Sequence, residues 1–149
     1  QEQFDAAEVL LRVLVSLEAK ITEKDLEVET ELPDGPVMVW GDPDAVTQVC
    51  YNLLDNAVKH TPEGGAITLK AAGLDEKIEV RVSNTGEGIL PTDLPYIFER
   101  FYKADKSHSG GGTGLGLSIA REIMRGLGES IRAESEKGET RFILTLSVR

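Results

Sequence analysis

The feature that most constrains the fold of this sequence is a pair of segments, 66–72 and 77–83, in which apolar and polar residues alternate. Alternation with a period of two is typical of strands with one buried face. The four residues 73–76 between the segments predict a hairpin. Strands are grouped with strands along the chain, and helical patterns lie between the groups. The sequence therefore predicts an α+β fold: a two-layer sandwich of a mixed, mostly antiparallel sheet with helices on one face.

The rest of the chain adds helical and strand-like segments and one long stretch with neither pattern. Apolar residues three and four apart predict helices at 5–21, 44–60, 92–98 and 115–126. Alternating patterns predict strands at 26–32, 37–40, 131–134 and 140–148. In the last helix, the residues expected to face the core are Ile119, Ile123, Met124 and Leu127. Residues 99–114 are polar and glycine-rich, and so long a loop in a compact domain is typically functional or disordered.

Length, charge and cysteine content limit the class of function. The 149 residues suit a single domain, 1–149. A formal net charge of −10 argues against general binding of nucleic acid or of an anionic membrane surface. Cys50 is the one cysteine, which excludes an internal disulfide framework and suits a reducing compartment. No segment approaches the ~20 consecutive apolar residues of a membrane-spanning helix.

The predicted helix 44–60 has an unusual polar face. At about 100° per residue, one arc is apolar, and the opposite arc holds Gln48, Asn52, Asp55, Asn56 and Lys59, with His60 at its edge. An asparagine inside a helix costs about 0.5 kcal/mol or more relative to alanine, so two of them one turn apart are a costly choice for mere solvation. Carboxamide oxygens suit Mg²⁺, which commonly shares substrate phosphates and water. The face is either a solvated surface or part of a nucleotide site in which Lys59 reaches the polyphosphate.

Two glycine-rich loops are further candidates. The first, 84–89, directly follows a predicted strand; its glycines allow close approach of a ligand, Asn84 can pair with a base edge and Ile89 can pack on a ring. The second, 110–117, opens a helix whose free N–H groups and positive end favour anions. Its spacing matches neither the Walker nor the Rossmann pattern. A flexible loop that needs glycine only for mobility explains the second loop equally well.

Five segments, taken in order, resemble the catalytic ATP-binding domain of bacterial sensor histidine kinases. They are an N box at 52–60, a first glycine box at 84–88, an F box at 98–102, a second glycine box at 112–117 and a G-x-T-x-F segment at 138–142. Order and spacing agree from about Phe4 to Arg149. The resemblance implies the Bergerat-type ATP-binding fold, shared with DNA gyrase, mismatch-repair ATPases, a heat-shock chaperone and anti-sigma serine kinases. Residues 99–114 would then form the ATP lid.

The resemblance also implies ATP and Mg²⁺ as cofactors, and a role for each matching residue. Catalytic roles fall on Asn56, Lys59 and Lys103, with the side-chain oxygen of Asn56 as the Mg²⁺ ligand. Tyr102 and Lys103 would close over the nucleotide from the lid. The residues expected to bind the nucleotide are Asn52, Asn56, Lys59, His60, Asn84, Gly86, Gly88, Ile89, Tyr102, Lys103, Gly112, Thr113, Gly114, Leu115, Gly116, Leu117 and Thr140.

One position departs from the pattern of the family. The first glycine box most often begins with an aspartate that pairs with the adenine amino group, whereas this chain has Asn84. A carboxamide oxygen can accept the same hydrogen bond, but charge assistance, which roughly doubles the strength of such a bond, is lost. We therefore expect adenine selectivity to survive with modestly weaker affinity.

The resemblance further implies partners that the chain itself does not supply. Its histidines are His60 and His108, and neither is preceded by a helical-hairpin pattern. We therefore expect this chain to be a catalytic domain that does not autophosphorylate alone. It would act on a separate dimerisation and phosphoacceptor domain, and indirectly on a response regulator, as the cytoplasmic part of a membrane-bound sensor. Two alternatives stay open: a nucleotide-dependent binding module without kinase output, and an anti-sigma-type serine kinase, which the F box disfavours.

Overall fold

The computed structural model describes residues 1–99, 102, 115–136 and 138–148. Its centre is a seven-stranded sheet in the order β1-β3-β7-β5-β4-β2, with β6 also paired to β7. Of the strand pairs in the described ranges, only β2 and β4 run parallel, so the sheet is mixed and mostly antiparallel, as predicted. The strands are β1 (Glu2–Asp5), β2 (Glu27–Glu31), β3 (Met38–Gly41), β4 (Ala66–Leu74), β5 (Lys77–Thr85), β6 (Ile131–Glu136) and β7 (Glu139–Ser147).

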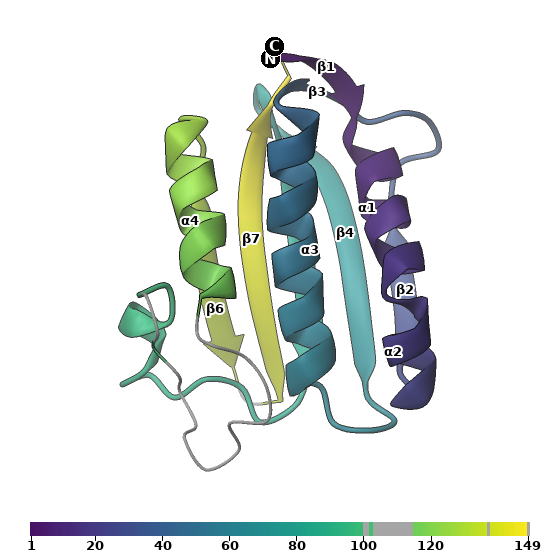
Figure 1. Cartoon of the computed structure of the whole chain (residues 1–149), viewed down its shortest axis with the longest axis vertical. Helices are drawn as coiled ribbons and strands as arrows, with labels where there is room; N and C mark the ends of the chain where they lie inside the picture. The colour runs from purple at the N-terminus through teal and green to yellow at the C-terminus, as the bar shows by residue number, and fades with distance from the viewer. Residues whose placement is uncertain (100–101, 103–114, 137, 149) are drawn as a thin grey trace.

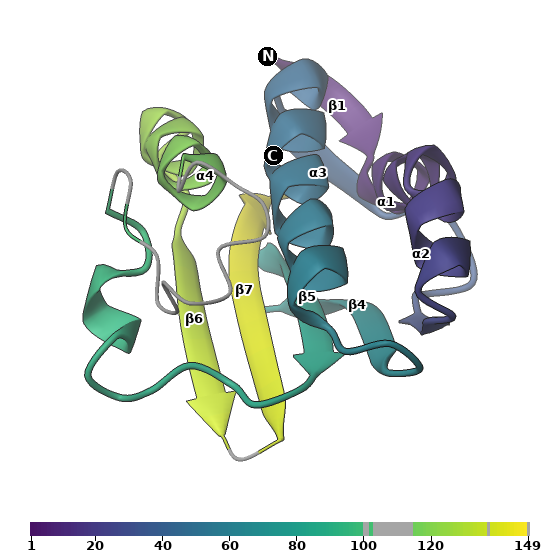
Figure 2. The same ribbon diagram turned by 60° about the horizontal axis from the view of Figure 1, so that its bottom comes forward.

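Helices cover one face of this sheet, and α3 lies in the middle of the helical layer (Figure 1). Turning the molecule shows the helices as a layer separate from the strands (Figure 2). The core between the layers is built from the alternate residues of β4, β5 and β7 and the apolar arc of α3. The helices are α1 (Ala6–Ser16), α2 (Glu18–Glu23), α3 (Pro43–His60), the short 3₁₀ helix η1 (Leu94–Tyr96) and α4 (Gly116–Gly126).

The sequence of α3 fixes both its ends. Asp42 Oδ1 accepts hydrogen bonds from the backbone N–H groups of Asp44 and Ala45, at 3.1 and 3.2 Å, and Pro43 occupies the first turn. At the other end, the N–H of Thr61 donates to the carbonyl of Ala57 at 3.0 Å. The predicted apolar arc is buried, which leaves the polar residues of the N box on the outward side.

Two expectations for local structure were wrong, and one strand was not predicted. The predicted first helix is interrupted at Leu17, which separates α1 from α2. Residues 2–5 form a strand, because they pair with β3 far along the chain. Ile119 was expected to face the core, yet it is 44% exposed, while Ala120 and Met124 are fully buried. At about 100° per residue, Ile119 lies a quarter-turn away from Ala120, at the margin of the buried stripe.

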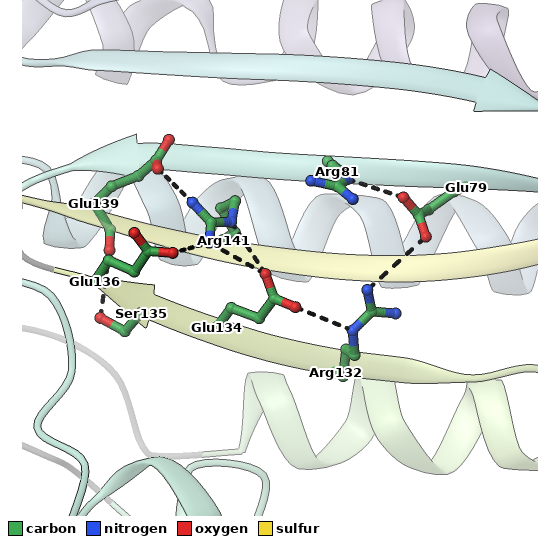
Figure 3. Close-up of polar contacts among 8 residues, drawn as sticks. All are labelled: Glu79, Arg81, Arg132, Glu134, Ser135, Glu136, Glu139 and Arg141. Atoms are coloured by element: carbon green, nitrogen blue, oxygen red, sulfur yellow. Dashed lines mark hydrogen bonds and ion pairs between the residues drawn. The ribbon is translucent and has the colours of Figure 1, made fainter.

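No helix of the described residues covers the other face of the sheet, which carries an ion-pair ladder (Figure 3). Arg141 on β7 lies within 2.6–3.2 Å of the carboxylates of Glu134, Glu136 and Glu139. A second group continues the ladder through Arg132, Glu79 and Arg81.

The ladder covers an apolar residue. Ile143 lies on the uncovered face, between Arg81 on β5 and Arg132 on β6 in the strand register, yet its exposure is 0%. The stems of long charged side chains can shield apolar surface in this way.

Candidate functional site

The N-box helix and the glycine-box helix meet at Asn52. The Asn52 side chain donates from Nδ2 to the carbonyl oxygen of Gly116, the first residue of α4, at 3.1 Å. Its own oxygen accepts a hydrogen bond from Gln48 Nε2 at 2.8 Å. Both the nitrogen and the oxygen of the Asn52 amide are therefore hydrogen-bonded, and the side chain links the start of α4 to α3. The helical pattern placed Gln48 on the same face but gave it no role. Its spacing of four residues from Asn52 was the feature of the sequence that could have indicated this hydrogen bond.

Asn56, one turn further along α3, differs from Asn52. Among the described residues, no partner hydrogen-bonds its carboxamide, and the side chain is half-buried. Lys59 lies on the same face, with its Nζ 3.1 Å from Asp55 Oδ2, and His60 ends the helix in an exposed position. A carboxamide with no partner beside a flexible ammonium group is chemically suited to a divalent cation and an anion bound together.

Two buried polar side chains mark the end of the sheet beneath α3. Asn84 on β5 and Thr140 on β7 are neighbours in the strand register, and each is only 6% exposed. The strand alternation turns Asn84 toward the same side as buried Val80 and Val82. Asn84 Nδ2 donates to the carbonyl of Thr85 at 3.1 Å, which leaves the side-chain oxygen as the group able to accept a hydrogen bond from a ligand.

The first glycine loop is shaped by packing. Gly88 has φ +84°, and a Cβ added there would lie 2.6 Å from Ser135 Oγ and 3.2 Å from the Glu136 carbonyl oxygen. The same Ser135 hydroxyl accepts a hydrogen bond from the backbone N–H of Ile89 at 2.7 Å. Gly86, with φ +146°, likewise has a conformation that side-chain-bearing residues rarely adopt. Gly88 thus lets the loop lie against β6, and the hydrogen bond to Ser135 places half-buried Ile89 beside the end of the sheet.

The second glycine box is described only in part. Leu115, Gly116 and Leu117 form the start of α4, where the Leu115 carbonyl accepts hydrogen bonds from the Ile119 N–H and the Ser118 hydroxyl, both at 2.9 Å. Four predicted site residues lie outside the described residues, namely Lys103, Gly112, Thr113 and Gly114.

Tyr102, expected to close over a nucleotide, has another partner in this structure. Its hydroxyl donates to Asp93, and its ring centroid lies 6.0 Å from that of Tyr96 in η1. The hydrogen bond from Tyr102 to Asp93 raises the pKa of the Tyr102 hydroxyl. The tyrosine is thus held against η1 here, and its role at a nucleotide stays a prediction.

The donors of the site suit a magnesium nucleotide better than a metal held by protein alone. Within the described ranges, no group of three or more His, Cys, Asp or Glu side chains could hold an ion. Asn56 offers a single hard oxygen ligand. Mg²⁺ in nucleotide sites is commonly bound by one or two protein oxygens, with phosphates and water completing the octahedron.

Comparison with known proteins decides the family. A family model described as histidine kinase-, DNA gyrase B-, and HSP90-like ATPase matches residues 41–149. The chain belongs to this family. It is 40% identical over 118 residues to the adaptive-response sensory kinase SasA of Trichormus variabilis, covering 77% of this chain and 29% of that protein. It is 39% identical over 121 residues to the sensor histidine kinase WalK of Bacillus subtilis, covering 78% of this chain and 20% of that protein.

Solved structures agree with the sequence comparison. The catalytic domain of histidine kinase ThkA superposes with a TM-score of 0.87 at 29% identity, covering 97% of this chain and 93% of that one. The mycobacterial sensor histidine kinase MprB gives a TM-score of 0.85 at 28% identity, covering 98% of this chain and 96% of that one. The predicted fold and the resemblance to a histidine kinase catalytic domain are therefore confirmed. The chain spans less than a third of the length of the curated relatives named above.

One contact near the site has no counterpart in the sequence-based expectations. Lys24, just after α2, donates from Nζ to the carbonyl oxygens of Val58 and Lys59 at 2.7 and 3.1 Å. It thereby satisfies carbonyls in the last turn of α3, which have no partner within the helix. The packing of α2 against α3 brings these groups together, and no pattern in the sequence indicates it.

Proposed function

We propose that this domain binds Mg²⁺–ATP and donates the γ-phosphoryl group to a histidine on a separate dimerisation domain. The observation that carries the proposal is the hydrogen bond from Asn52 to Gly116, which holds the N-box helix and the glycine-box helix together with the Asn56 carboxamide, unpartnered among the described residues, alongside. Membership of the histidine kinase-like ATPase family supports the identity of the nucleotide. Among the described residues, no helix is both long and apolar enough to cross a membrane.

Each residue of the site has a proposed task. Asn56 holds the cation through its side-chain oxygen, and the cation neutralises charge on the phosphates. Lys59 and His60 approach the phosphates, with Lys103 of the lid as a further catalytic cation. The backbone of residues 114–116 cradles phosphate at the start of α4. Phosphoryl transfer depends chiefly on such positioning and charge neutralisation, so a domain without an acceptor can still supply half of the reaction.

The adenine end is assigned to the polar end of the sheet. The Asn84 oxygen accepts from the adenine amino group, Thr140 lies near the base and Ile89 packs on the ring. The placement of Asn84 and Thr140 supports this assignment, because they are largely buried neighbours in the strand register and a base packed there would meet both side chains.

The direct test adds the missing partner. The chain is incubated with γ-labelled ATP and Mg²⁺, with and without a separately purified dimerisation domain from a related histidine kinase. Label is expected on the supplied domain only. Label on this chain alone would contradict the proposal, whereas nucleotide binding without any transfer to supplied domains would favour a binding module. A relative in this family, ThkA, has been solved in complex with the response regulator TrrA, and we propose a response regulator as the indirect partner here.

A further inference from the structure

Asp55, on the outward side of α3, is shared by two lysines. Its Oδ1 lies 3.2 Å from the Nζ of Lys20 on α2, and its Oδ2 lies 3.1 Å from the Nζ of Lys59 on α3. The Asp55 side chain is only 16% exposed, whereas those of Lys20 and Lys59 are 54% and 44% exposed. One largely buried carboxylate therefore serves two ammonium groups, one at each oxygen.

Lys59 stands between two different neighbours on the helix. At about 100° per residue, Asp55 lies about 40° to one side of Lys59 and Asn56 about 60° to the other. The backbone at this point is tied down, because Lys24 donates to the carbonyl oxygens of Val58 and Lys59. The side chain of Lys59 is thus the movable part, and its ion pair draws it toward Asp55 and away from Asn56.

The cost of releasing Lys59 depends on what Asp55 retains. A carboxylate that is mostly buried is costly to leave without a cation. Lys20 remains 3.2 Å from Asp55 Oδ1 when Lys59 moves away, so the carboxylate stays paired. The hydrogen bond from Lys20 to Asp55 raises the pKa of Lys20, so this contact favours the charged form of the lysine.

We infer that Asp55 and Lys20 are positioning residues that set how readily Lys59 reaches the phosphates of a bound nucleotide. Asp55 competes with the phosphates for Lys59, and Lys20 weakens that competition by sharing the carboxylate. The inference rests on the proposed function, because it takes Lys59 as a phosphate contact. It adds two residues to the site, one of them on α2, outside every segment of the site described above.

A double-mutant cycle tests the inference. Affinity for Mg²⁺–ATP is measured by calorimetry for the wild type, Lys20→Met, Asp55→Asn and the double variant. Lys20→Met is expected to weaken binding about two- to fivefold and Asp55→Asn to tighten it by a similar factor, the scale of a partly exposed ion pair. In the double variant, the effect of Lys20→Met should vanish, because Lys20 acts through the Asp55 charge.

Controls separate positioning from folding and from general charge. Lys70→Met removes another exposed lysine, which pairs with Glu31 at 3.9 Å on the β2–β4 side of the sheet, and should leave affinity unchanged. Asp55→Glu retains the charge and should bind close to the wild type, and Asp55→Ser provides a second neutral variant if Asp55→Asn folds poorly. Adenosine has no phosphates, so every variant should bind it equally.

The outcomes distinguish the inference from the proposed function. The inference is overturned if Lys20→Met has no effect on Mg²⁺–ATP, if its effect persists in the Asp55→Asn background, or if adenosine affinity changes in parallel. A wild-type domain that binds no Mg²⁺–ATP would overturn the proposed function and the inference together. The inference alone would be overturned if the wild type binds Mg²⁺–ATP, Asn56→Ala loses this binding, and the variants of Lys20 and Asp55 all bind with the affinity of the wild type.

Discussion

Asn56→Ala should separate ligand binding from folding. The Asn56 carboxamide makes no hydrogen bond to any described residue, so its removal leaves none of their donors or acceptors without a partner. Alanine is favoured over asparagine inside a helix by about 0.5 kcal/mol. We therefore expect the free energy of unfolding to stay within about 0.5 kcal/mol of the wild type. Affinity for Mg²⁺–ATP should fall at least about tenfold, because removing even a residue that only supports a metal ligand typically lowers metal affinity about 10- to 100-fold.

Asn52→Ala is the matched comparison on the same helix. It removes two hydrogen bonds, to Gln48 and to Gly116, each with a net contribution of about 0.5–1.5 kcal/mol. After the gain in helix propensity, the expected loss of stability is about 1 kcal/mol. Of the two variants, Asn52→Ala should therefore show the larger loss in free energy of unfolding. Asn56→Ala should show the loss of affinity for Mg²⁺–ATP without a comparable loss of stability.

Urea denaturation and calorimetry with and without Mg²⁺ provide the two readouts. The affinity loss of Asn56→Ala should disappear when Mg²⁺ is chelated, because the side chain acts through the cation. Equal losses with and without Mg²⁺ would refute the assignment of Asn56 as a ligand. So would a destabilisation of Asn56→Ala as large as that of Asn52→Ala.

Three further predictions concern stability. The Glu129 side chain is only 5% exposed, which opposes its charge, but hydrogen bonds from Lys77 and Ser147 outweigh this and lower its pKa below the ordinary value. Glu129→Ala should lower the free energy of unfolding by about 2–3 kcal/mol at pH 7, measured by urea denaturation. The stabilisation that comes from the charge of Glu129 is complete above pH 4.5 and is lost as the pH falls through the lowered pKa. A series of unfolding curves at different pH values checks this dependence. Asp25 follows α2 with φ +55°, so Asp25→Gly should stabilise by about 0.5–1 kcal/mol in thermal unfolding. Gly88→Ala should destabilise by about 1–3 kcal/mol, with an altered amide signal for Ile89 in NMR spectra, because its Cβ would meet Ser135 Oγ.

The parts of the fold that the sequence predicted are those with strong local patterns. The hairpin of β4 and β5 follows from clean alternation, and α3 follows from its capping residue Asp42 and its apolar arc. β1 was missed because its four residues have no period of their own and are strands only through pairing with β3. Ile119 was wrongly predicted to face the core. Helical spacing gives the width of the apolar stripe on α4, but it does not show which edge of that stripe the neighbouring α3 covers.

The candidate site divides in the same way. Motif resemblance alone was enough to assign Asn52, Asn56 and Asn84 to one predicted site. It did not reveal that Asn52 is held by Gln48 and Gly116, whereas the Asn56 carboxamide has no partner among the described residues. The contact of Lys20 with Asp55 depends on how α2 packs beside α3, which is a tertiary property and leaves no mark in local sequence.

The ion-pair ladder on the uncovered side of the sheet bears on where other molecules can dock. Each guanidinium group drawn in Figure 3 is already matched by a carboxylate of the same or a neighbouring strand. An incoming protein would have to replace contacts of equal quality, so its net gain in free energy from this side would be small. We therefore expect the sheet to stay open to water without attracting other proteins, and we expect partners to bind on the helical side of the molecule.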